Sequence, residues 1–380
     1  MPNRRPLTIG LTEASAAVAD IGVLLPIAAA LVLVNGVDAG AALGFAGLLF
    51  VVAGLVYRVP MPVQPIKAAA AIAIATKAPP AMLAAAGIGL GAILLVLALT
   101  RLVPLAAKLF PTTIIRGNQL GVGILLLFAA YQLVDGSDQI GLAVAAAIAA
   151  TVAALPRARG PVALALVAGG IGWTMLQGGT VALGADPTLP SLAIPSWGTI
   201  VTAMTLLVIP QLPLTFGNAI VGTADLEHEY YGARARRVTP TNLALSCGLA
   251  NVTLGMFGGM PLCHGSSGAT AYHRFGARTG GVNLVIGGAL LAAGLVFAPA
   301  ALTLFGMIPP AVLAGLLAYT GLEHGLLVAD QRGPSMAIAV AMGVIGGATR
   351  NLAIGMAVGL PAYAAVALAG RARAALGGAR

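Results

Sequence analysis

The chain has 380 residues, of which 59% are apolar and only 8% are charged, and its mean hydropathy is +0.98. A soluble domain usually carries about 25% charged residues, because polar groups must cover its surface. This composition excludes a water-soluble enzyme, a disordered tail and a nucleic-acid-binding module, and it indicates a protein with many membrane spans. The net charge of +9 therefore needs an explanation other than nucleic acid.

A helix needs about 20 apolar residues to cross a hydrocarbon core about 30 Å thick. Charged residues and clusters of Gly, Pro, Asn and Asp divide the chain into fourteen predicted segments, seven on each side of a polar, proline-rich stretch at 179–198. The first seven are 14–35, 39–57, 64–77, 80–104, 112–133, 139–155 and 161–178. The other seven are 199–222, 240–257, 264–275, 280–298, 300–322, 334–349 and 351–369. We therefore predict an all-α polytopic membrane protein.

The basic residues predict the orientation in the membrane. An even number of spans puts both termini on one side, and 16 of the 20 Lys and Arg residues fall on that side. Only Lys77 and Arg350 fall in loops on the opposite side. Because short cytoplasmic loops are enriched in Lys and Arg, we predict cytoplasmic termini in the cell membrane and an extracytoplasmic loop at 179–198. The positive charge is thus a topology signal.

The third and tenth segments are too short to cross as helices, and each begins with non-helical sequence. Residues 60–67 read Pro-Met-Pro-Val-Gln-Pro-Ile-Lys, and residues 260–265 read Met-Pro-Leu-Cys-His-Gly. Prolines at alternate positions forbid a helix before Pro65. The two Met-Pro pairs are 199 residues apart, at matching places in each set of seven. This pattern predicts an inverted repeat of residues 1–178 and 199–380 with two half-helices, which is typical of a transporter binding site.

Two half-helix ends that meet at membrane depth would form an anion site, because each presents unpaired N–H groups and the positive end of a dipole. Gly265 allows close backbone approach, Ser266 and Ser267 add hydroxyl donors, and Lys67 adds a full positive charge. The alternative is that the prolines are packing kinks and Lys67 extends to an interface. No metal site or cofactor is predicted.

Other polar residues inside the segments need a reason to be there, because ionisable groups are costly in the bilayer. Asp20 and His264 are candidates for carrying a proton, or else structural hydrogen-bonding groups. Gln211 and Thr215 share one face of the bent eighth segment, as a pocket wall or as contacts between helices. The charged residues 225–229 are expected to form a solvated loop beside three arginines.

Three strings, at 60–67, 210–215 and 260–265, together with residues 272–280, resemble the molybdate transporter family that is related to sulfate permeases. The resemblance implies the seven-plus-seven inverted-repeat fold shared with uracil permease. In that fold a core domain, built from the first four segments of each repeat, moves against a gate domain built from the last three. The motifs imply that the substrate is surrounded by Gln64, Lys67, Gln211, Cys263, His264, Gly265, Ser266 and Ser267. Ser266-Ser267-Gly268 departs from the small-residue pattern expected there.

These features predict a secondary active transporter of a tetrahedral oxyanion, with molybdate first, rather than an enzyme. No nucleotide-binding loop is recognised, so an ion gradient would drive uptake. A proton is the simplest coupling ion, because each negative charge that enters an inside-negative cell opposes about 2.3 kcal/mol per 100 mV. The alternatives are a sulfate or other oxyanion transporter and an uncoupled anion channel. The sequence is compatible with a homodimer in the lipid bilayer.

Overall fold

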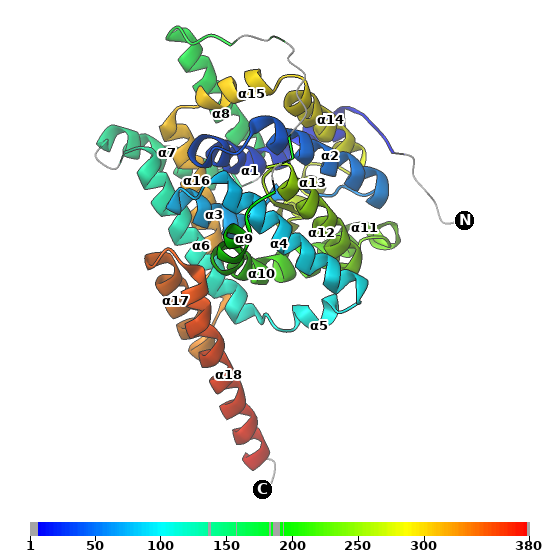
Figure 1. Ribbon diagram of the computed structural model, residues 1–380, viewed down its shortest axis with the longest axis vertical. Helices are drawn as coiled ribbons and strands as arrows, with labels where there is room; N and C mark the ends of the chain where they lie inside the picture. Colours follow the sequence, from blue (N-terminus) through cyan, green and yellow to red (C-terminus); the bar gives the residue numbers. More distant parts are fainter. Residues whose placement is uncertain are drawn as a thin grey trace.

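The computed structural model describes residues 7–135, 138–156, 158–181, 184, 191–192 and 194–377, apart from the side chains of 11, 15, 18–23 and 370–377. Helices dominate this part of the chain (Figure 1). The first half contains α1 (Leu11–Asn35), α2 (Ala39–Tyr57), α3 (Lys67–Thr76), α4 (Pro80–Leu99), α5 (Val103–Ala107), α6 (Thr112–Leu133), α7 (Gln139–Ala154) and α8 (Arg159–Leu176).

The second half begins with a continuous bent rod in which α-helical and π-helical turns alternate. The rod comprises α9 (Trp197–Ala203), η1 (Met204–Val208), α10 (Ile209–Leu214), η2 (Thr215–Gly222) and α11 (Thr223–Tyr231), and it is followed by a 3₁₀ turn, η3 (Gly232–Ala235). The remaining helices are α12 (Pro240–Met256), α13 (Ser266–Arg274), α14 (Gly281–Leu295), α15 (Ala298–Gly306), α16 (Pro310–Gly325), η4 (Leu326–Asp330), α17 (Gly333–Ala348) and α18 (Leu352–Gly377).

The polytopic character predicted from hydropathy is present in the structure. Among the described residues, 7 helices are long and apolar enough to cross a membrane, or 8 if α14 and α15, which meet at 96°, form one bent span. Four further apolar helices of 10–17 residues include α3, α7 and α17. Many large apolar side chains face outward, among them Ile140 at 79% and Leu176 at 85% exposure, as expected of a surface that lipid covers.

Three predicted segments have different limits in the structure. The segment expected at 300–322 is two helices, α15 and α16, because Pro309 and Pro310 end one helix and begin the next. The segment expected at 80–104 ends at Leu99 and is followed by the short α5. The segment expected at 199–222 continues as helix to Tyr231, because Pro210 and Pro213 produce π-helical turns rather than a break.

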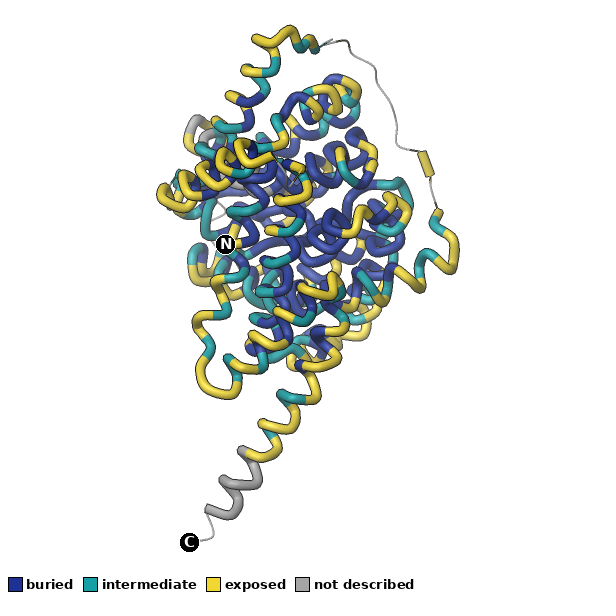
Figure 2. Tube along the Cα trace, turned by 90° about the vertical axis from the view of Figure 1, so that its left-hand side faces the viewer, coloured by how far each residue is buried: buried dark blue, intermediate teal, exposed yellow. Residues whose placement is uncertain are grey.

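The helices form two groups that meet along α3. On one side α2 packs against α14 and α4 packs against α12; on the other α6 packs against both α16 and α17, and α16 also contacts α7 (Figure 1). The half-helix α3 contacts α6, and α1 contacts α8, so these pairs join the two groups. Figure 2 shows that the centre of the molecule is buried, whereas α18 extends away from it as a largely exposed helix.

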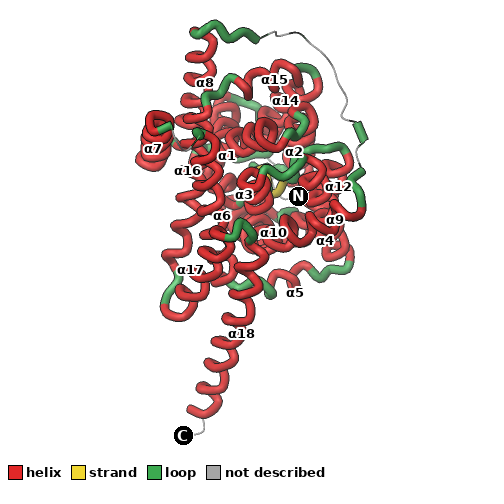
Figure 3. The backbone as a smooth tube through the Cα atoms, turned by 60° about the vertical axis from the view of Figure 1, so that its left-hand side comes forward, coloured by secondary structure: helices red, strands yellow, loops and turns green. Residues whose placement is uncertain are grey.

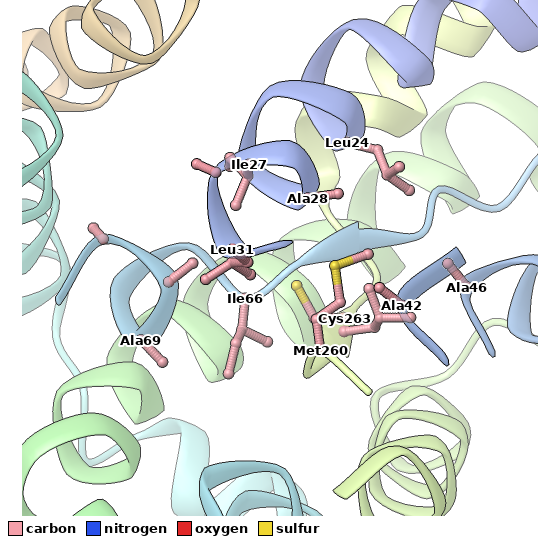
Figure 4. Close-up of a cluster of buried hydrophobic side chains, with 14 of the residues drawn as sticks. Leu24, Ile27, Ala28, Leu31, Ala42, Ala46, Ile66, Ala69, Met260 and Cys263 are labelled. Atoms are coloured by element: carbon pink, nitrogen blue, oxygen red, sulfur yellow. The ribbon is translucent and has the colours of Figure 1, made fainter. Parts of the chain in front are cut away.

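Two extended segments cross the middle of this helical body. They contain β1 (Gln64–Pro65) and β2 (Leu262–Cys263), which pair antiparallel and are the short strands visible in Figure 3. The turn into each extended segment uses a left-handed backbone, at Arg58 (φ 61°) and Gly258 (φ 68°). Figure 4 shows apolar side chains of α1 and α2 gathered around the strands, including Leu24, Leu31 and Ala42. This apolar layer holds the strands inside the bundle.

Glycines let α2 and α14 pack backbone to backbone. A Cβ atom on Gly287 would lie 2.8 Å from the carbonyl oxygen of Gly47 and 2.9 Å from the amide nitrogen of Val51. The next residue, Gly288, faces open space. Because two backbones cannot give way as a flexible side chain can, Gly287 is required by packing and Gly288 is not.

We predict that Gly287→Ala lowers the melting temperature of the detergent-solubilised protein by several degrees, because overpacking costs about 1–3 kcal/mol. Gly288→Ala is the matched control on the same helix. It should melt at the same temperature or slightly higher, since alanine favours a helix over glycine by up to about 1 kcal/mol. Equal melting temperatures for the two variants would contradict this close packing of α2 on α14.

Candidate functional site

The two half-helices begin side by side because their leading strands are paired. Gln64 lies opposite Cys263 and Pro65 opposite Leu262, and the amide of Ile66 donates to the carbonyl oxygen of Pro261 over 3.1 Å. Two residues of strand on each side then give way to α3 and α13. The arrangement places the N-termini of the two helices together in the centre of the molecule.

Two buried asparagines satisfy the backbone of the extended segments. Asn251 on α12 accepts from the amide of Leu262 over 2.9 Å and donates to the carbonyl oxygen of the same residue over 2.6 Å. Asn283 on α14 makes the same two kinds of contact with Met61, accepting from its amide over 2.9 Å. Both asparagines are fully buried. They perform the backbone pairing that buried extended chain requires, and the sequence analysis missed them.

The N-terminus of α3 is capped by a residue 143 positions away from Ala68 rather than by its own neighbours. The amides of Ala68 and Ala69 donate to Oε1 of Gln211 over 2.9 and 3.2 Å. Nε2 of Gln211 in turn donates to Oγ1 of Thr215 over 3.1 Å. The structure thus places an oxygen acceptor on the positive end of this helix, which is the chemistry that an oxyanion would supply.

Lys67, the first residue of α3, is buried with a relative exposure of 5%. Its Nζ donates to Oγ of Ser267 on the opposite half-helix over 3.3 Å. Among the side chains that the structure describes, ion pairs join only Arg116 to Asp330 and Arg159 to Glu323. Within that part of the chain, no carboxylate lies within 4 Å of the ammonium group, although a buried cation is stabilised chiefly by a nearby negative charge.

The beginning of α13 packs against the side chain of Gln64, which would have to shift to admit a side chain at Gly265. A Cβ atom there would lie 2.4 Å from Oε1 of Gln64. The hydroxyl of Ser267 contacts the same Gln64 oxygen at 3.5 Å, and the hydroxyl of Ser266 donates to Oδ1 of Asn218. The predicted residues Gln64, Lys67, Gly265, Ser266 and Ser267 are therefore brought together around the two helix ends.

Cys263 and His264 lie in the packed core instead. Cys263 is 6% exposed within β2, and His264 is fully buried. Because a carbonyl oxygen only accepts, Nδ1 of His264 carries a proton and donates it to Pro62 over 2.9 Å; Nε2 lies 2.8 Å from the hydroxyl of Ser246. The other proton-carrying candidate, Asp20, has its side chain outside the described residues.

A cavity of about 240 Å³ lies between the half-helices and the second group of helices. Lys67 and Ser267 line it, together with charged and polar side chains that were not selected from the sequence: Arg159, Arg274, Tyr319, Thr320, Glu323 and His324. Arg159 pairs with Glu323 over 2.5 Å and lies over the ring of Tyr319 at 5.4 Å. The wall of this cavity carries a net positive charge, because it contains three cationic side chains and one carboxylate: Lys67, Arg159, Arg274 and Glu323.

From the sequence, Arg159 and Arg274 are among the 16 basic residues assigned to loops and segment ends on the cytoplasmic side. A signal was nevertheless present on α16, where Thr320, Glu323 and His324 recur at helical spacing and so share a face. A polar face on an apolar helix indicates a partner or a cavity. The sequence shows the polar face of α16, but only the structure shows that this face lies opposite the half-helices across the cavity.

Comparison with known proteins agrees with this architecture. The family model described as "Molybdate transporter of MFS superfamily" matches residues 12–126 and 203–323, which include both half-helices and the bent rod from η1 to α11. The chain belongs to this family.

Curated relatives and solved structures extend the likeness over most of the chain. The chain is 28% identical to "Molybdate transporter 2" of Arabidopsis thaliana, over 84% of this chain and 79% of the relative. It is 27% identical to "Molybdate transporter 1" of the same plant, over 92% of this chain and 86% of the relative. The transmembrane domain of the cyanobacterial bicarbonate transporter BicA matches with a TM-score of 0.67 at 18% identity, over 90% of this chain and 96% of that domain. Murine Slc26a9, an anion transporter in the inward-facing state, matches with a TM-score of 0.67 at 13% identity, over 97% and 70%. These two likenesses show the fold.

We predict that Gln211→Glu weakens oxyanion binding about tenfold or more while the protein remains folded. The carboxylate would still accept from Ala68 and Ala69 and would be favoured by the positive end of α3. It would also repel an anion beside Lys67, and a like charge at such range costs about 1 kcal/mol or more. Calorimetry with molybdate and a melting curve would measure the two effects. Thr215→Val removes the acceptor of Gln211 in the same wall without adding a charge, so it should lose less affinity than Gln211→Glu. Equal losses of affinity in both variants would contradict the electrostatic argument.

Proposed function

We propose that the protein is a secondary active transporter that takes up a tetrahedral oxyanion, with molybdate as its first substrate. The observation that carries the proposal is the buried ammonium group of Lys67, which contacts Ser267 of the opposite half-helix and has no carboxylate within 4 Å among the described side chains. A buried cation without a protein counter-charge is stabilised by binding an anion. The two helix N-termini beside it add the positive ends of their dipoles.

The donors around this point suit an oxyanion with four equivalent oxygens. Lys67 and the hydroxyls of Ser266 and Ser267 can donate, and so can the α3 amides if the Gln211 oxygen is displaced. Hydrogen bonds to charged acceptors are about twice as strong as neutral ones, so this set favours an anion over a neutral solute. We assign Gln64, Gln211 and Thr215 to the wall of the same site. Cys263 and His264 are assigned to its supporting layer.

The helix pairings support an inverted repeat that divides the chain at 179–198. If residues 1–178 and 199–380 are repeats, α2 corresponds to α12, α4 to α14, α6 to α16 and α7 to α17. Exchanging the repeats then turns the contact of α2 with α14 into that of α12 with α4, and the contact of α6 with α17 into that of α16 with α7. Both members of each pair of contacts are present in the structure. We therefore propose that the first group is a core domain and the second a gate domain, and that transport moves one against the other.

The predicted orientation in the membrane indicates the side toward which the cavity faces. The cavity is lined by Arg159 and Arg274, which lie at the face predicted to be cytoplasmic. This supports an inward-facing arrangement with both termini inside the cell. Proton coupling is part of the proposal, because a dianion must otherwise enter against the membrane potential. Substrate-dependent counterflow in proteoliposomes tests transport itself: a channel would conduct anions without it.

We predict that Lys67→Met weakens molybdate binding by at least about tenfold, because a charge-assisted hydrogen bond contributes about 1.5–3 kcal/mol. Arg116→Met removes the same charge from a helix of the second group, where Arg116 pairs with the exposed Asp330 over 2.5 Å. That control should change affinity by less than about twofold, since screened surface charges contribute little. Similar losses in the two variants, measured by calorimetry on folded protein, would remove Lys67 from the binding site.

We predict that molybdate and tungstate bind with similar affinity and that both bind at least about tenfold more tightly than sulfate, a difference of about 1.4 kcal/mol. The larger oxyanions lose less hydration on entering the site, while the fixed donors impose one separation on all three. Competition of each anion against bound molybdate would measure the order. Sulfate that displaces molybdate at equal concentration would make the protein a sulfate transporter, with Ser266 and Ser267 closing the site around the smaller ion.

A further inference from the structure

Glu227 is a fully buried carboxylic acid on α11, beside a small apolar cluster that includes residues of α2 and α12. It lies on α11 with a relative exposure of 0%, whereas Asp225, His228 and Glu229 beside it are exposed. The expectation of a solvated charged loop at 225–229 is therefore wrong for Glu227. The physical reason is that α11 continues as helix and turns this one position of the cluster toward the core.

Neither carboxyl oxygen of Glu227 has a hydrogen-bond partner among the described residues. Its neighbours on the same face of α11, Ala224 and Tyr231, pack in an apolar cluster with Tyr57, Val59 and Met61. An ionised carboxylate in such surroundings would be an uncompensated buried charge, which folded proteins avoid by binding a proton. Burial without a hydrogen-bond partner therefore favours the neutral, protonated acid in this conformation.

Charged and titratable groups on the surrounding elements do not compensate this carboxyl. Tyr57 and Tyr231 lie in the same cluster, His273 contacts the ring of Tyr231, and Arg234, Arg278 and Glu13 act electrostatically on Tyr231. Arg234 and Arg278 are occupied with carbonyl oxygens, the former at Arg278 and the latter at His273 and Ala277. Oε1 of Glu13 accepts from the amides of Arg278 and Thr279. Among the described residues, no ion pair involves Glu227.

Glu227 lies between two contacts, one that joins α11 to the segment leading into α13 and one that joins it to α13 itself. One turn before it, the hydroxyl of Thr223 donates to the carbonyl oxygen of His264 over 3.2 Å. One turn after it, Tyr230 contacts Thr270 at 3.1 Å, and Thr270 lines the cavity. A negative charge at Glu227 would require water or a cation in this layer, and α11 could not admit either without disturbing both contacts.

We propose that Glu227 is the group that binds and releases the transported proton, and that its protonation keeps α13 in the anion-binding position. This inference rests on the proposed function of proton-coupled oxyanion uptake. A proton from outside neutralises the carboxylate, the neutral acid is buried as seen here, and the proton leaves to the cytoplasm when the layer opens toward the arginines after α11. Proton and anion then move together because the contacts between α11 and α13 link the protonation of Glu227 to the position of the half-helix that binds the anion.

The test uses purified full-length protein in proteoliposomes that contain a pH-sensitive dye. With the natural protein, molybdate uptake should carry protons inward and should rise by up to about tenfold for each unit of external acidification, the limit for one titrating group. Glu227→Gln imitates the protonated acid permanently. We expect it to bind molybdate and to catalyse counterflow, but to carry no protons and to change by less than about twofold per pH unit.

The matched control is Glu229→Gln, which removes an exposed carboxylate two residues away on the same helix and should keep the natural pH profile. Glu227→Asp keeps a carboxyl group and should keep proton movement with a shifted pH midpoint, which decides the question if the glutamine variant does not fold. An unchanged midpoint in Glu227→Asp, or a natural profile in folded Glu227→Gln, would overturn the proposal. Loss of the profile in His273→Gln alone would assign the proton to the histidine. A natural protein that moves molybdate without protons would instead overturn proton coupling itself.

Discussion

The whole structure depends on how two stretches of extended backbone are satisfied inside a helical membrane protein. A strand has no internal hydrogen bonds, and the hydrocarbon core offers no water to replace them. Here β1 and β2 pair with each other, and Asn251 and Asn283 pair with the chain on either side. With the backbone satisfied, both half-helices can begin at the centre of the molecule. Their positive ends then create the electrostatic setting of the site.

The same arrangement explains why polar side chains in the centre come from distant parts of the chain. A helix that begins inside the bundle has unpaired amides, and neither Ile66 nor Gly265 has a side chain that can cap them. Gln211 performs this role for α3 from a rod bent by two prolines, while Asn218 contacts the first serine of α13. The π-helical turns around these residues follow from Pro210 and Pro213. The bent rod thus serves both half-helices.

Small residues at the helix contacts let the helices within each of the two groups pack closely, whereas a cavity lies between the groups. Glycines bring α2 against α14 so closely that an added methyl group would contact backbone. Between the groups lies the cavity, lined by Lys67 on one side and by the polar face of α16 on the other. Tight packing within each group and a polar cavity between them suit relative movement of two rigid bodies. The ion pair of Arg159 with Glu323 spans α8 and α16, within the second group.

The sequence by itself determined the features that depend on local chemistry. Hydropathy indicated a helical polytopic protein, and the prolines at 60–65 and the matching string at 260–265 marked the strands and half-helices that the structure contains. Proline acts on its own backbone and on the preceding turn, so its effect can be predicted without the rest of the fold. Only the tertiary structure decided which side chains meet. It turned His264 toward Pro62 and Ser246, brought Arg159 and Arg274 to the cavity, and buried Glu227 within a cluster that looks solvated in the sequence. These outcomes depend on contacts between residues up to 202 positions apart, and no local pattern encodes the direction in which a helix face will point.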